Sequence, residues 1–299
     1  MFRKDAADGF CMALADSVPG VSGGTVAFIL GFYDQFIDSV HDVVFGKGRE
    51  RLDGLKYLIR LMCGWAVGMG LAVLILNALF EQHIHFISSM FVGFLLGAIP
   101  VVIMEEKRAM KKWRRGIPFL IAGAVLVTAI TWLNVQDVSH AMDLSAFSAG
   151  LALKLFFVGM AAISAMFLPG ISGSTILLIF GAYMPIMNAL KDLMHGNAAC
   201  LPAILVFIVG IIAGASSVVK LIQRGLTYDR PQMIYFILGM MAASLYAVVM
   251  GPATLSVPAA PLDLSNFSWY ACLIGVALIA LMEMTKSGRI QKITAGIHA

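Results

Sequence analysis

Residues 19–33 of the chain read PGVSGGTVAFILGFY, and residues 169–183 read PGISGSTILLIFGAY. Eight of the fifteen aligned positions are identical, and most of the others are apolar in both copies. The match continues upstream at the same offset, where Gly9 pairs with Gly159 and Lys4 pairs with Lys154. The chain therefore consists of two related halves, and each half contains one copy of a Pro-Gly-x-Ser-Gly-x-Thr loop.

The chain is too apolar for a water-soluble protein. Hydrophobic residues make up 60% of its 299 residues and charged residues 13%, and the mean hydropathy is +0.89. A soluble domain carries about 25% charged residues. Apolar runs long enough to cross about 30 Å of hydrocarbon occur at 57–80, 86–104, 117–134, 201–222, 232–251 and 267–283. We therefore predict an all-α polytopic membrane protein with one integrated membrane domain.

Two further apolar stretches, residues 5–40 and 153–190, are interrupted near their centres by Pro-Gly. Each leg has about 12–15 residues and is about 20 Å long as a helix, which is too short to cross the bilayer comfortably. Irregular backbone at membrane depth must be buried in protein or line a wet cavity. We interpret both stretches as re-entrant helical hairpins. Repeat 1 then covers residues 1–135, repeat 2 covers residues 150–285, and residues 286–299 form a tail.

Each half then contains a hairpin and three spans, so the second half is inverted relative to the first. Positive charges gather on the cytoplasmic side of membrane proteins. If segment 104–116 is cytoplasmic, 19 of the 21 Lys and Arg residues lie on that side, and the exceptions are Lys154 and Lys191. This orientation makes both termini cytoplasmic. Inverted repeats with broken helices are typical of secondary transporters.

The repeated loop has the parts of an anion-binding turn. Proline ends the incoming helix, and glycine lets a ligand approach the backbone. Serine and threonine hydroxyls cap the next helix, whose N–H groups and dipole favour an anion. One copy alone is adequately explained as a kink and a cap, but two symmetric copies favour binding. The predicted phosphate-binding residues are Pro19, Gly20, Ser22, Gly23, Gly24, Thr25, Pro169, Gly170, Ser172, Gly173, Ser174 and Thr175.

Three ionisable residues near the hairpins are further candidates. Asp16 lies three residues before Pro19, and an ionisable residue at that depth is a functional candidate. It either takes up a proton coupled to transport or hydrogen-bonds the loop backbone. Lys4 and Lys154 precede their prolines by fifteen residues, about 22 Å of helix. They either snorkel to the interface or attract the head group of a lipid phosphate.

We expect no cofactor, no metal ion and no nucleic-acid partner. His83 and His85 lack the carboxylate cluster that would make a metal site convincing. The four cysteines lack the Cys-x-x-Cys spacing of metal and redox sites: Cys11, Cys63, Cys200 and Cys272.

The paired loops, the Ile-x-Gly-x-Tyr that follows each, and the extended motif ADSVPGVSGGTVAFILGFYDQFI at residues 15–37 resemble the polyprenyl-phosphate transporters of the PopT type. The resemblance covers nearly the whole chain. It implies a flippase that moves undecaprenyl phosphate, or a related polyprenyl phosphate, between membrane leaflets. Its role would be carrier-lipid recycling for cell-envelope synthesis in a bacterial or archaeal cytoplasmic membrane. Coupling to a proton or sodium gradient is one hypothesis for the energy source. The transport direction, the coupling ion, the prenyl chain length, the oligomeric state and whether the two hairpins move together or alternately stay open.

Two other functions compete with this one. A membrane phosphatase acting on undecaprenyl diphosphate has inverted repeats, re-entrant hairpins and a similar Pro-Gly-x-Ser-Arg-Ser loop. Gly23 and Gly173 stand where that family has arginine, and phosphoryl transfer needs cations to stabilise the developing charge. This difference favours binding and transport over hydrolysis. A small-anion carrier or channel is the third function, and a lateral opening to lipid would argue against it.

Overall fold

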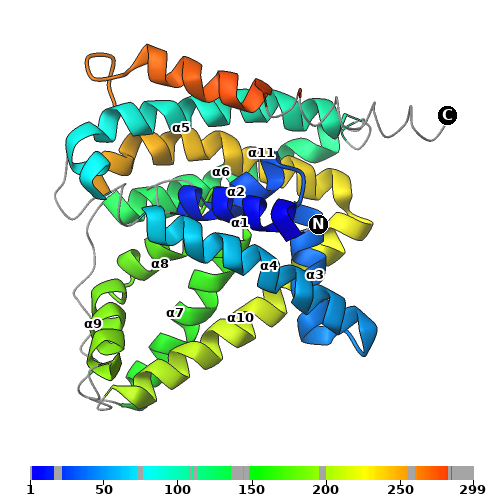
Figure 1. The fold of residues 1–299 in the computed structure, drawn as a ribbon, viewed down its shortest axis with the longest axis vertical. Helices are drawn as coiled ribbons and strands as arrows, with labels where there is room; N and C mark the ends of the chain where they lie inside the picture. The colour runs from blue at the N-terminus through cyan, green and yellow to red at the C-terminus, as the bar shows by residue number, and fades with distance from the viewer. Residues whose placement is uncertain are drawn as a thin grey trace.

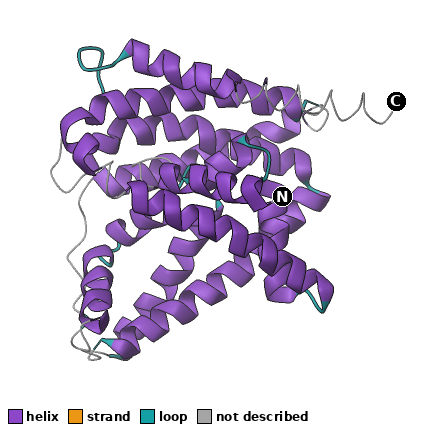
Figure 2. Ribbon diagram, viewed as in Figure 1, coloured by secondary structure: helices purple, strands orange, loops and turns teal. Residues whose placement is uncertain are grey.

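The structure is a computed structural model that describes residues 2–16, 22–72, 77–107, 110, 113–135, 144, 148–194, 200–254, 260–281 and 284. Within these residues the regular secondary structure is helical, without strands (Figure 2). The helices are α1 (Phe2–Asp16), α2 (Gly23–Ile29), α3 (Tyr33–Phe45), α4 (Arg49–Leu71), α5 (Asn77–Glu105), α6 (Trp113–Val135), α7 (Ala149–Phe167), α8 (Gly173–Ile179), α9 (Tyr183–Met194), α10 (Leu201–Tyr228), α11 (Arg230–Met250), the short 3-10 helix η3 (Gly251–Thr254) and a last helix, Trp269–Leu281.

Five helical segments are long and apolar enough to cross a membrane: His83–Glu105, Arg114–Leu133, Ala149–Phe167, Leu201–Tyr228 and Arg230–Met250. The prediction of a polytopic all-helical protein is therefore confirmed. The re-entrant character of the hairpins and the inversion of the second half stay predictions.

The helix boundaries differ from the predicted ones in several places, and α5 begins at Asn77 instead of residue 86. The predicted span 57–80 begins within α4, which runs from Arg49 to Leu71, and its last residues belong to α5. The first turns of α4 are charged, so hydropathy did not find its beginning. The predicted span 267–283 falls on the shorter helix Trp269–Leu281. The first leg of the second hairpin, α7, has 19 residues, more than the 12–15 that were expected.

Glycines bring the first leg of each hairpin into backbone contact with the helix that follows the hairpin. Gly9 of α1 lies against the backbone of α4, and Gly159 of α7 lies against the backbone of α10 in the same way. The contacts are reciprocal, because Gly64 of α4 faces the backbone of α1 and Gly210 of α10 faces that of α7. Small residues permit such close packing between membrane helices. The sequence repeat is thus matched by two equivalent helix pairs.

The last helix of each half packs against the other half. Gly93 of α5 lies against the backbone of Cys272 in the last helix, and Gly239 of α11 lies against the backbone of Leu120 in α6. Figure 1 shows the last helix, in orange to red, running along α5. Each half therefore packs its last helix on the other half, so the halves form one interleaved unit.

The largest hydrophobic core lies between the first hairpin and the second half. Its fully buried side chains include Tyr33, Ile37, Leu61, Ile237 and Met241, from α3, α4 and α11. The hydroxyl of Tyr33 also donates a hydrogen bond to the carbonyl of Phe167, at the end of α7, over 2.9 Å. This core fixes the first hairpin against the beginning of the second loop.

Candidate functional site

The two Pro-Gly-x-Ser-Gly-x-Thr loops contact each other directly. The backbone N–H of Gly170, in the second loop, donates to Ser22 Oγ at 3.0 Å and to Thr25 Oγ1 at 2.7 Å. The hydroxyl of Ser22 in turn donates to the carbonyl of Leu168 at 3.3 Å. Ser22 and Thr25 each expose 1% of their surface. The hydroxyls of the first loop are therefore bonded to the backbone of the second.

The first loop is locally stabilised by a helix cap. Ser22 has an extended backbone, and its Oγ accepts a hydrogen bond from the backbone N–H of Thr25 at 3.2 Å. Such a cap satisfies one of the free N–H groups at a helix N-terminus. Gly23 and Gly24, in the first turn of α2, are buried together with these residues. The predicted Pro19 and Gly20 lie outside the described residues.

The second loop has the same sequence pattern but a different environment. Ser172 precedes α8 with an extended backbone, yet its side chain does not cap the helix. Its Oγ instead lies 2.6 Å from Ser174 Oγ. Ser174 is exposed, and Ser172, Gly173 and Thr175 are partly exposed. The hydroxyls of the second loop are thus accessible, whereas those of the first are covered.

Gly170 can be understood from its backbone angle and its neighbours. Its φ is 88°, a left-handed conformation that side chains rarely adopt. A Cβ at this position would also collide with Ser244 Oγ of α11, whose hydroxyl donates to Met240 O at 2.8 Å. Pro169 and Gly170 are both buried. The Pro-Gly step of the second loop therefore requires glycine for steric reasons.

Asp16 supports the first loop. Its carboxylate accepts hydrogen bonds from the backbone N–H of Gly23 at 2.6 Å and from Trp65 Nε1 of α4 at 3.0 Å. Of the two predicted roles, the geometry fits loop support, and proton coupling stays a prediction. The positions equivalent to Asp16 and Trp65 in the second half are Met166 and Ile211. The beginning of α8 therefore lacks this carboxylate, which explains part of the difference between the loops.

Lys4 and Lys154 are exposed near the beginnings of α1 and α7. Each stands about 22 Å along its helix from the loop that follows. The structure therefore does not bring them to the loops, and head-group attraction at the hairpin mouths stays a prediction.

Sequence reasoning missed several residues that connect the elements around the loops. Trp65 and Tyr33 are the clearest, and neither stands in a local pattern that indicates its partner. Arg230, at the start of α11, pairs with Glu106 at the end of α5 and with Asp34 of α3 at 2.8 Å. The sequence offered one signal for this ion pair, because Asp34 directly follows the first copy of the repeated motif. These contacts hold the first hairpin to α4, α7 and α11.

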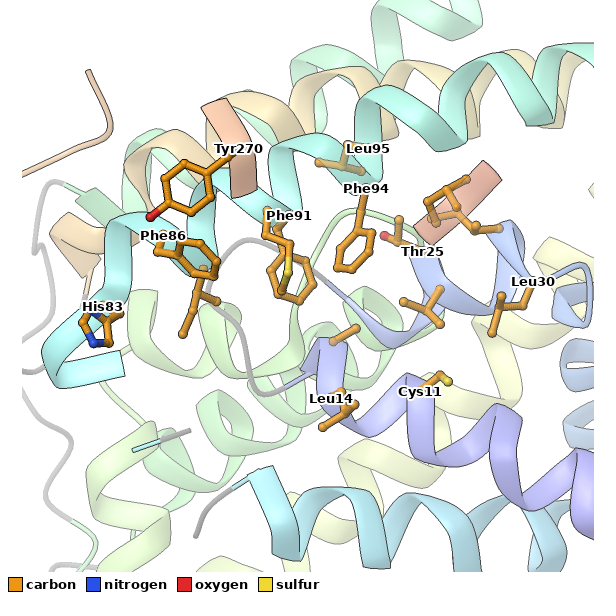
Figure 3. A pocket seen from close by; sticks show the side chains of 16 residues that line it. Cys11, Leu14, Thr25, Leu30, His83, Phe86, Phe91, Phe94, Leu95 and Tyr270 are labelled. Carbon is orange, nitrogen blue, oxygen red and sulfur yellow. The ribbon is translucent and has the colours of Figure 1, made fainter. Parts of the chain in front are cut away.

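An apolar cavity of about 650 Å³ lies beside the first loop. Its lining comes from α1, α2, α5 and the last helix: Cys11, Leu14, Ala15, Thr25, Val26, Ile29, Leu30, His83, Phe86, Ile87, Met90, Phe91, Phe94, Leu95, Tyr270 and Ile279. Figure 3 shows His83 and Phe86 at one end and Thr25 and Leu30 at the other, with Phe91 and Phe94 between them.

In the part of the chain that the structure describes, no cluster of three or more His, Cys, Asp or Glu residues could hold a metal ion.

Comparison with known proteins connects this geometry to a family. The VCA0040-like family, described as undecaprenyl phosphate translocase-like, matches residues 12–264. The chain belongs to this family. Among curated relatives, a polyprenyl-phosphate transporter of Staphylococcus aureus is 34% identical over 246 residues, which cover 82% of this chain and 86% of the relative. A polyprenyl-phosphate transporter of Vibrio cholerae is 32% identical over 260 residues, covering 83% and 78%. No solved structure matches the chain.

Proposed function

We propose that the protein translocates undecaprenyl phosphate, or a related polyprenyl phosphate, between the leaflets of the cytoplasmic membrane. Its membership of an undecaprenyl phosphate translocase-like family and its relatives' names support this substrate class. The observation that carries the proposal is the direct contact between the two Pro-Gly loops beside an apolar cavity. A polar centre next to an apolar space suits an amphipathic substrate with a small head group and a long hydrocarbon chain.

The head-group phosphate is held by the groups that bond the loops to each other. Phosphate oxygens accept hydrogen bonds, and the available donors are the N–H of Gly170 and the hydroxyls of Ser22 and Thr25. Binding therefore replaces loop-to-loop bonds with loop-to-phosphate bonds. The accessible hydroxyls of Ser172 and Ser174 are the first that a phosphate arriving from the second hairpin would meet.

This exchange gives a physical route for translocation. In an inverted pair of hairpins, the two loops approach the bilayer centre from opposite sides, and substrate sites of such transporters lie near the midplane. The bonds between Gly170 and the first loop close the passage between the hairpins. A phosphate that takes over these bonds separates the loops, and its departure to the other side lets them close again. Both termini are cytoplasmic in this arrangement.

Transport fits the loops better than phosphate hydrolysis does. Hydrolysis needs cations that stabilise the charge of the transition state. The position where the phosphatase family carries arginine is Gly23, where a Cβ would lie 2.8 Å from the Asp16 carboxylate and would collide with Met12. The first loop therefore has no room for a longer side chain at this point.

A leaflet-translocation assay tests the proposal. The purified protein is reconstituted into liposomes with a fluorescent polyprenyl phosphate, and a membrane-impermeant quencher reports the fraction in the outer leaflet. The protein should accelerate exchange relative to protein-free liposomes and should release no inorganic phosphate from undecaprenyl diphosphate. Exchange no faster than in empty liposomes would refute transport, and phosphate release would support the enzyme.

A further inference from the structure

We propose that the apolar cavity between the first hairpin, α5 and the last helix binds the isoprenoid chain of the substrate, with the phosphate end at Thr25. The inference rests on the proposed function and assigns the part of the substrate that the loops do not hold. It makes the first half of the protein the chain-binding half.

The lining of the cavity sets the chemistry of its occupant. One wall is the face of α5 that carries Ile87, Phe91 and Leu95, and the facing wall comes from α1 and α2. No Lys, Arg, Asp or Glu side chain lines the cavity in the part of the chain that the structure describes. Thr25 lies at one end and His83 and Tyr270 lie at the other (Figure 3). Between these ends a polar or charged solute would lose its hydration without gaining partners. The occupant is therefore a hydrocarbon.

The position of Thr25 gives the orientation of that hydrocarbon. Thr25 lines the cavity and also accepts the hydrogen bond from Gly170 that joins the two loops. The cavity extends from this residue past Phe94 and Phe91 to Phe86 and His83 (Figure 3). A chain that lies along it places its polar end at the loop contact. A prenyl chain with a terminal phosphate meets this requirement.

The size and the walls of the cavity fit a segment of such a chain. Its volume of about 650 Å³ is within the range of about 300–1,000 Å³ found for ligand pockets. A long polyprenyl chain is larger, so the units next to the phosphate occupy the cavity and the remainder lies among lipid. The wall carries four aromatic rings, and apolar rings suit methyl-branched, unsaturated units: Phe86, Phe91, Phe94 and Tyr270.

Two residues of the cavity wall have different partners at the equivalent positions of the second half. In the second half, Ala165 and Ile176 stand at the positions of Ala15 and Val26, and they belong to a packed cluster with Val127 and Met240. Ala15 and Val26 instead pack with the α5 side chains that form the cavity wall. Protein interiors normally contain few voids larger than a water molecule. An apolar space of about 650 Å³ beside such a wall indicates a place that a ligand fills.

A native cysteine provides a direct test of chain binding. Cys11 lines the cavity, and Cys63 is exposed on α4. Two single-cysteine variants form a matched pair: one keeps Cys11, the other keeps Cys63, and each carries alanine at the other three cysteine positions. Polyprenyl phosphate at ten times its Kd should slow maleimide labelling of Cys11 about tenfold, since about a tenth of the sites stay empty. Labelling of Cys63 should not change. Polyprenol, which lacks the phosphate, should protect Cys11 at higher concentration, whereas inorganic phosphate should not.

A second measurement uses a substitution that fills the cavity. Ile87→Trp places a large side chain in the cavity, and overpacking of this kind should reduce transport about tenfold or more. Leu96→Trp is the control, because Leu96 lies on the same helix and is 47% exposed. It should transport at the wild-type rate.

The outcomes separate the two proposals. Failure of the wild-type protein to exchange polyprenyl phosphate refutes the proposed function, while protection of Cys11 by polyprenol would still support chain binding. Wild-type transport with equal labelling of Cys11 in the presence and absence of the lipid overturns the chain site. Should Ile87→Trp not fold, the labelling result decides by itself.

Discussion

Replacing Thr25 by valine removes one hydroxyl at the loop contact and keeps the shape of the side chain. In the structure, Thr25 Oγ1 accepts from the Gly170 N–H at 2.7 Å, and Ser22 Oγ accepts from the same group at 3.0 Å. Gly170 thus keeps one partner in the variant. Thr25 Oγ1 also lies 3.1 Å from Ser22 Oγ, and Ser22 keeps its bond to the carbonyl of Leu168. The loss of stability should therefore be that of two hydrogen bonds, about 1–3 kcal/mol, and not that of an unsatisfied buried donor.

Thr25→Val should also weaken binding of the substrate. A hydrogen bond to a charged group contributes about 1.5–3 kcal/mol, which corresponds to an affinity about 10- to 150-fold weaker. Binding is measured by titrating the protein in detergent with fluorescent polyprenyl phosphate, translocation by quenching in liposomes, and stability by thermal unfolding.

Thr175→Val is the matched variant. Because Thr175 is partly exposed, its hydroxyl can be lost with little change in stability, while affinity for the lipid should still fall. A Thr25→Val protein that binds and transports like wild type would refute a role for Thr25 in phosphate binding.

Three further substitutions test the contacts around the loops. Gly170→Ala should lower the free energy of unfolding by roughly 2–5 kcal/mol, because of left-handed strain and the collision with α11. Gly150→Ala is the control, because a Cβ there meets nothing within 4 Å. Equal thermal unfolding of the two variants would contradict the steric requirement for glycine at position 170. Asp16→Ala should impair transport more than Asp16→Asn, because asparagine keeps an oxygen acceptor for the Gly23 N–H. If transport by Asp16→Asn instead falls to that of Asp16→Ala at every pH, the carboxylate charge itself is required and loop support is insufficient. Arg230→Ala should lower the free energy of unfolding by about 1 kcal/mol or less, since the ion pairs of Arg230 are partly exposed. The difference from wild type in thermal unfolding should shrink at high salt. A difference that persists at high salt would show that Arg230 stabilises the protein through packing.

The sequence was most informative where the structure depends on residues close together in the chain. The cap of α2 by Ser22 follows from an interaction across three residues. Gly9 was found from the sequence only as part of the repeat, and the structure adds that it lies against the backbone of α4. The helical membrane architecture follows from composition, since apolar segments of this length cannot remain exposed to water.

The boundaries of α4 and the partners of charged residues were less predictable. α4 begins with Arg49, Glu50 and Arg51, which form helix as readily as apolar residues do but carry no membrane signal. The pairing of Arg230 with Asp34 and Glu106 joins residues 196 and 124 positions apart. No local sequence pattern specifies such pairs, because any of the neighbouring charged residues could pair with Arg230.

By itself, the sequence determined that the protein has two related halves, that it is helical and membrane-embedded, and that each half carries a Pro-Gly-x-Ser-Gly-x-Thr loop. Only the tertiary structure decided that the two loops differ. Asp16 and Trp65 support the first loop, whereas Met166 and Ile211 occupy the equivalent positions in the second. The physical reason is that a loop motif specifies its own turn through bonds across a few residues. Its burial, its partners and the cavity beside it depend on helices that are distant in sequence.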